Sequence, residues 1–113
     1  MNLSSKERSM VLQIRMEILP INLETGRYRN IPVEKRVCFN CTDTIENEMH
    51  FLLQCPVYDD YRNVLLNNVN DVQFEYMNDF SKISFLCTYF PRQLAKYVCH
   101  AFEKRQQIVY SDN

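Results

Sequence analysis

Three cysteines and one histidine near the middle of the chain have the spacing of a metal site. They follow the pattern Cys38-x₂-Cys41-x₈-His50-x₄-Cys55. Thiolate sulfur and imidazole nitrogen suit tetrahedral Zn²⁺, and three thiolates with one imidazole make a closed, structural ligand set. Because a closed set leaves no position for water, the pattern predicts a structural zinc ion as cofactor and no catalytic activity. The function then depends on what the zinc-stabilised scaffold presents.

Other interpretations of the cysteines remain open. Three buried thiols and a surface histidine would produce the same letters, and a C-x₂-C pair also serves thiol redox chemistry. A catalytic zinc would need an open position and a general acid or base, for which Glu48 is the nearest candidate. The remaining cysteines, Cys87 and Cys99, fit small core residues on or beside the inward faces of predicted helices.

Length and composition predict one helical domain. The chain has 113 residues, enough for a single domain over 1–113, and its single glycine argues against an all-β fold. The net charge of −1 does not by itself indicate a nucleic-acid binder. Since no apolar run has membrane-spanning length, we expect no membrane partner and a nuclear or cytoplasmic location. Cysteines there are reduced or metal-bound.

Helical patterns lie on both sides of a predicted zinc-knuckle segment, 27–62. An N-terminal helix is expected over about 4–19, with a capping box from Ser4 and Glu7 and a stop at Pro20. C-terminal helices are expected over about 78–110, with Asn78 or Asp79 as N-cap and an interruption at Pro91. The predicted fold class is therefore mostly α: a small helical domain with a central CCHC zinc knuckle.

Residues 21–37 read as irregular, with Gly26 in a left-handed turn and a short helical turn after Pro32. Residues 46–54 then read as a helix. His50 and Cys55 lie five positions apart, so on an α-helix they would point about 140° apart, at ~100° per residue. We therefore expect this helix to end or tighten at Cys55, because Pro56 disfavours the α conformation of the preceding residue.

The helix predicted after Pro56 carries an apolar stripe, and so does the one that begins at Asn78 or Asp79. Both stripes recur at helical spacing, which predicts that they face the core. The residues expected to point inward are Val57, Tyr61, Val64, Leu65 and Val69 in the first helix, and Phe80, Ile83, Cys87 and Phe90 in the second.

Three stretches, 24–32, 34–38 and 48–58, carry a family resemblance. With the H-F-L-x-x-C-P-x-Y tail, the cysteine–histidine pattern resembles the zinc-binding domain that follows the polymerase in non-LTR retrotransposon reverse transcriptases. The resemblance implies a C-terminal fragment of such an element, with a nuclear role of holding template RNA or target DNA. It carries Cys38, Cys41, His50 and Cys55 over as zinc ligands. The chain departs from the whole element because it holds no polymerase or endonuclease.

Basic and aromatic residues gather before and within the knuckle. Basic groups contact phosphates and aromatic rings stack on bases, so these residues are candidate contacts for single-stranded RNA or DNA. The alternative is a solvated face with local ion pairs and packed rings. The candidates are Arg27, Tyr28, Arg29, Lys35, Arg36 and Phe39, and a second basic cluster on the last predicted helix comprises Arg92, Lys96, Lys104 and Arg105.

Two functions follow from these patterns. The first is a zinc-stabilised nucleic-acid-binding module. The alternative is a protein-interaction module on the same scaffold, domesticated from a mobile element, which would bind a partner protein through an apolar stripe on the last helix. That stripe would comprise Leu94, Val98 and Phe102. The acidic stretch 42–58, which contains no Lys or Arg, favours the alternative.

Overall fold

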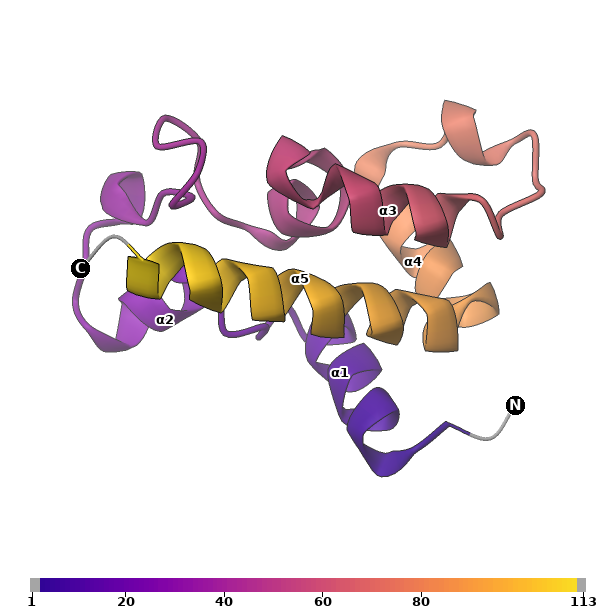
Figure 1. The fold of residues 1–113 in the computed structure, drawn as a ribbon, viewed down its shortest axis with the longest axis horizontal. Helices are drawn as coiled ribbons and strands as arrows, with labels where there is room; N and C mark the ends of the chain where they lie inside the picture. The colour runs from indigo at the N-terminus through magenta and orange to yellow at the C-terminus, as the bar shows by residue number, and fades with distance from the viewer. Residues whose placement is uncertain (1–2, 112–113) are drawn as a thin grey trace.

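The computed structural model describes residues 3–111, so residues 1–2 and 112–113 of the predicted domain lie outside the described part. The fold is 67% helical, which confirms the predicted mostly α class. Within residues 3–111 no β-strand forms, and the one antiparallel bridge joins Val37 to Ile45. The α-helices are α1 (Ser5–Arg15), α2 (Asn22–Tyr28), α3 (Asp59–Leu66), α4 (Asp79–Tyr89) and α5 (Pro91–Ser111) (Figure 1).

Helix α5 is the central element of the fold. It runs along the molecule in Figure 1 and packs against α1, α3 and α4. Its inward side chains Leu94, Val98 and Ala101 are fully buried, and burial of a leucine or valine side chain stabilises the fold by about 1.5–3 kcal/mol. Half-buried Phe102 packs against Phe51, with ring centroids 5.0 Å apart. The apolar stripe suggested as a protein-docking face therefore belongs to the core.

Helix α1 begins as predicted but ends early. The Ser4 hydroxyl accepts from the Glu7 N–H at 3.1 Å, and the Glu7 carboxylate accepts from the Ser4 N–H at 2.9 Å. The predicted end near residue 19 is wrong, because the helix stops at Arg15 and Glu17 turns the chain at φ 58°. After this turn Leu19 lies in the core with 1% exposure.

The prediction of an irregular segment at 21–37 is partly wrong, because residues 22–28 form α2. Gly26 lies inside this helix and has no positive φ. A Cβ on Gly26 would lie 2.6 Å from Arg36 Cγ, so glycine is needed there for close packing and not for a left-handed turn. The left-handed residue is Asn30, at φ 56°. The short turn expected after Pro32 is a 3₁₀ turn, Val33–Lys35.

The C-terminal half follows its proline and cap signals. The Asn78 side chain accepts from the Ser81 N–H at 2.8 Å to start α4, and Pro91 starts α5. The prediction that Val64 and Phe80 point inward is wrong, because each side chain is 66% exposed. A 3₁₀ turn, Phe74–Tyr76, lies between α3 and α4. Among the described helices, none is both long and apolar enough to span a membrane.

Candidate metal centre

A tight turn presents the first two cysteines. The bridge between Val37 and Ile45 closes the loop, and the Cys38 N–H donates to the Thr44 carbonyl at 2.8 Å. The Thr42 N–H donates back to the Cys38 carbonyl at 3.0 Å, and Thr42 adopts φ 36°. These bonds turn the chain within four residues, so that both sulfurs face the same side, towards Cys55.

A widened helical turn presents the other two ligands. Residues 48–54 are helical, and over His50–Gln54 the turn is π-helical, with the Cys55 N–H donating to the His50 carbonyl at 2.7 Å. The helix ends at Cys55, which confirms the expectation that it would end or tighten there, and the turn before the end widens. Closing a turn over five residues brings Cys55 back to the side of His50, a geometry common at functional sites. Cys55 itself is extended (φ −65°, ψ 120°), as expected before Pro56.

The widened turn leaves two carbonyls that need partners. Pro56 has no N–H to donate to Phe51, five residues earlier. The Tyr97 hydroxyl donates to the Phe51 carbonyl at 2.5 Å, and Arg62 Nε donates to the Leu52 carbonyl at 3.0 Å. Arg62 Nη2 also donates to the Tyr97 hydroxyl at 3.0 Å. Tyr97 thus supplies the hydrogen bond that the proline removes, and buried Arg62, only 5% exposed, contacts both carbonyls and the Tyr97 hydroxyl.

The four predicted ligands converge on one point. Their donor atoms all lie within 4.8 Å of one another. Cys55 Sγ is 3.8 Å from both Cys38 Sγ and Cys41 Sγ. A tetrahedral ion with metal–sulfur bonds of about 2.3 Å separates its sulfurs by about 3.8 Å, whereas a disulfide requires about 2.05 Å. The residues therefore fit a tetrahedral metal ion, and a disulfide between these sulfurs is excluded.

The surroundings of the ligands also fit a metal ion. His50 Nε2 is buried and, within the described residues, has no hydrogen-bond partner, a costly state that a metal bond would remove. Asn47 Oδ1 accepts from the His50 backbone N–H at 2.8 Å and holds the start of this turn. Burial lowers the pKa of His50, which favours the neutral imidazole that a metal requires. Burial, together with the neighbouring sulfurs, raises the pKa of Cys55 to about 12, so this thiol is protonated without a metal, and metal binding would release its proton.

A buried ion pair ties the metal-site loop, residues 37–46, to the rest of the fold. Glu46, 1% exposed, accepts from Arg105 Nη2 at 2.8 Å and from Arg105 Nε at 2.9 Å. The Asn22 N–H donates to the same carboxylate at 2.5 Å, and Arg105 Nη2 reaches Asn22 Oδ1 at 3.0 Å. The loop is thereby joined to the start of α2 and to α5. Sequence reasoning missed Glu46, and it interpreted Arg105 as part of a surface cluster.

Five of the six predicted nucleic-acid contacts are exposed, and four of these lie on α2, at its end or in the 3₁₀ turn that follows. Arg27, Tyr28 and Arg29 end α2, and Lys35 follows in the 3₁₀ turn. Tyr28 is 74% exposed, and the Arg27 guanidinium lies 5.3 Å from its ring centroid. Arg27 Nη2 also lies 3.1 Å from the Glu24 carboxylate. These side chains form what we call the α2 basic face: Arg27, Tyr28, Arg29 and Lys35.

The other two predicted contacts have structural partners. Arg36 donates from Nε to the Ile31 carbonyl at 2.8 Å and from Nη1 to the Leu23 carbonyl at 3.0 Å. Phe39 is 42% exposed, and the Arg105 guanidinium lies 5.0 Å from its ring centroid. Both residues hold the metal-site loop in place. They are therefore not counted in the α2 basic face.

The second basic cluster does not form one surface. Arg105 faces inward to Glu46, whereas Lys104 Nζ lies 5.8 Å from the ring centroid of Tyr61. Arg92 Nε lies 3.8 Å from a carboxylate oxygen of Glu7 on α1. These cationic groups therefore contact three different parts of the fold.

No protein family, curated protein or solved structure matches this chain in our comparisons. Interpretation of the site therefore depends on its own geometry. Three thiols and one imidazole, converging at metal-ligand distances inside the fold, are compatible with a metal ion. The four residues lie on two separate turns of the chain, which a structural metal ion would join.

Proposed function

We propose that the protein is a zinc-stabilised module that binds single-stranded nucleic acid and has no catalytic activity of its own. The observation that carries the zinc proposal is the convergence of Cys38, Cys41, His50 and Cys55 on one point. Thiolate and imidazole donors at tetrahedral spacing favour Zn²⁺ over harder ions such as Mg²⁺ or Ca²⁺. Four protein ligands complete the shell, so the ion would act as a structural cofactor.

The nucleic-acid proposal depends on the α2 basic face. Three cationic side chains and an exposed tyrosine lie next to the metal-site loop, where phosphates and an unstacked base could both be contacted. The resemblance to the zinc-binding domain of retrotransposon reverse transcriptases supports the same role. With only Arg27, Arg29 and Lys35 available for phosphates, binding would be weak and strongly salt-dependent.

Metal analysis of the purified protein tests the first half of the proposal. We expect one zinc ion per chain. A strong chelator should remove the ion, and residues 37–55 should then become disordered. Replacement by Co²⁺ should produce the visible absorption of a tetrahedral thiolate site. Protein that contains no metal, and keeps its stability in chelator, would refute the zinc proposal.

A salt titration with labelled single-stranded RNA and DNA tests the second half. Each phosphate contact contributes a slope of about −0.7 in log K against log salt for single strands, so Arg29→Ala should lower the magnitude of the slope by about that amount. Lys6→Ala, on the first turn of α1, is the matched control because it removes the same charge at an exposed site away from α2. Absence of binding at low salt, or equal effects of both variants, would contradict the proposal.

A further inference from the structure

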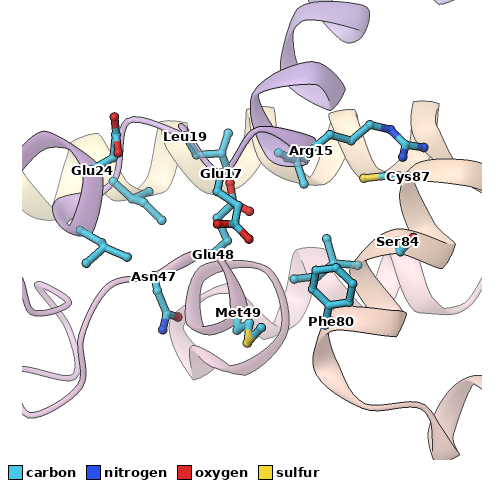
Figure 2. Close-up of a pocket in the computed structure, with 14 residues that line it drawn as sticks. Arg15, Glu17, Leu19, Glu24, Asn47, Glu48, Met49, Phe80, Ser84 and Cys87 are labelled. Carbon is cyan, nitrogen blue, oxygen red and sulfur yellow. The ribbon is translucent and has the colours of Figure 1, made fainter.

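A pocket of about 280 Å³ lies between α1, α2, α4 and the start of the helical turn that carries His50 (Figure 2). Its walls are mostly apolar, and Leu19, Met49, Phe80 and Ile83 contribute to them. The volume is slightly below the range of drug-sized ligand sites, so it suits a small ligand with about one ring. Nothing in the proposed function uses this space.

Two carboxylates line this pocket. Glu17 is exposed and Glu48 is half-buried, and their side chains overlap in the view of Figure 2. The Leu19 N–H donates to the Glu48 carboxylate, whereas Glu48 Oε1 is buried and has no hydrogen-bond partner among the described residues. Within residues 3–111, neither carboxylate forms an ion pair. Partial burial of the Glu48 carboxylate among apolar walls without a counter-ion is costly, which is a reason to expect a cationic occupant.

The other charged residues of the pocket do not supply that counter-ion. Glu24 also lines the pocket, but Arg27 Nη2 lies 3.1 Å from its carboxylate. Arg15 is the cation of the pocket lining, and its Nη2 donates to the Thr88 hydroxyl at 3.4 Å, towards α4. The chemistry left in the pocket is therefore a pair of acceptors surrounded by apolar side chains.

We propose that this pocket binds a small organic cation: a primary ammonium group carried on an apolar body such as a phenyl ring. The ammonium has three donors, which can be shared between the carboxylates of Glu17 and Glu48. The ring would lie against Phe80 and Ile83 on α4. A hydrated divalent cation suits the site poorly, because Ca²⁺ and Mg²⁺ require six or more oxygen ligands and the walls are apolar.

The proposal is tested by titrating the full, ¹⁵N-labelled chain with 2-phenylethylammonium and following amide shifts by NMR. The neutral isostere 2-phenylethanol is the control ligand, since it keeps the ring and removes the charge. We expect shifts around Glu17, Glu48 and Ile83, and binding of the cation at least about tenfold tighter than of the alcohol. Equal binding of both ligands, or no binding up to about 10 mM, would overturn the proposal.

Substitutions of the pocket residues identify which side chains contact the bound cation. Glu17→Gln and Glu48→Gln should each weaken cation binding about tenfold, whereas Glu24→Gln should leave it unchanged because that carboxylate is paired with Arg27. Since Glu48 is close in sequence to His50, Phe80→Ala provides a test away from the ligand turn. Phe80 is 66% exposed, so its loss should weaken binding without unfolding the chain. If Mg²⁺ or Ca²⁺ produces the same shifts and the ammonium ion does not, the site is a divalent-cation site and the proposal is wrong.

Discussion

Replacing Arg105 by methionine should strongly destabilise the protein, because it leaves a buried carboxylate without its counter-ion. Glu46 is 1% exposed and the Arg105 side chain 13% exposed, so the pair is largely removed from water. Breaking such a pair from one side costs about 3–5 kcal/mol. The Asn22 N–H still donates to Glu46 in the variant, so we expect the lower end of that range, about 3 kcal/mol. For a chain of this size the melting temperature should fall by about 12 °C.

The change in the free energy of unfolding is measured by urea denaturation at pH 7 with zinc present in excess. Unfolding is monitored by circular dichroism. Lys104→Met is the matched control, because it removes the same charge from the neighbouring position of α5. Lys104 is half-buried and its Nζ lies 5.8 Å from the ring centroid of Tyr61, an interaction of about 0.5–1 kcal/mol. The control should therefore lose no more than about 1 kcal/mol.

A double variant separates the buried charge from lost packing. Glu46→Gln combined with Arg105→Met removes both charges and keeps the shape of the glutamate side chain. It should be more stable than Arg105→Met alone by about 2 kcal/mol, because no unpaired charge remains in the interior. The reasoning is refuted if Arg105→Met costs less than about 1 kcal/mol and the double variant shows no recovery.

Three further substitutions test other parts of the argument. Cys41→Ser should lower the zinc content below one ion per chain and increase hydrogen exchange in residues 37–55, and unchanged metal content and melting temperature would contradict it. Arg62→Met should lower the free energy of unfolding by about 3 kcal/mol in urea, since the Leu52 carbonyl loses its donor; an effect under about 1 kcal/mol would refute that role. Gly26→Ala should destabilise by about 1 kcal/mol, despite the better helix propensity of alanine, because its Cβ would clash with Arg36. In an Arg36→Ala background the same change should become stabilising, which chemical denaturation of the wild type, the two single variants and the double variant would show.

Local signals were sufficient for the metal ligands and for several helix boundaries. The ligand spacing of Cys38, Cys41, His50 and Cys55 identified a group that the fold brings within 4.8 Å. The caps at Ser4 and Asn78 and the proline at position 91 also act where expected, because a cap or a proline works on backbone groups within a few residues. Pro56 was correctly linked to the end of the ligand helix, although the turn before it widens instead of tightening.

The tertiary structure decided which charged and apolar residues are buried. Arg62 and Arg105 look like surface cations in the sequence, yet each is held inside the fold by partners that only folding brings near, and Arg105 pairs with a residue 59 positions away. Conversely, Val64 and Phe80 have the spacing of core residues and are exposed. Periodicity specifies one face of a helix, but whether that face contacts protein or water depends on elements distant in the chain, and burial of a charge depends on partners that periodicity does not specify.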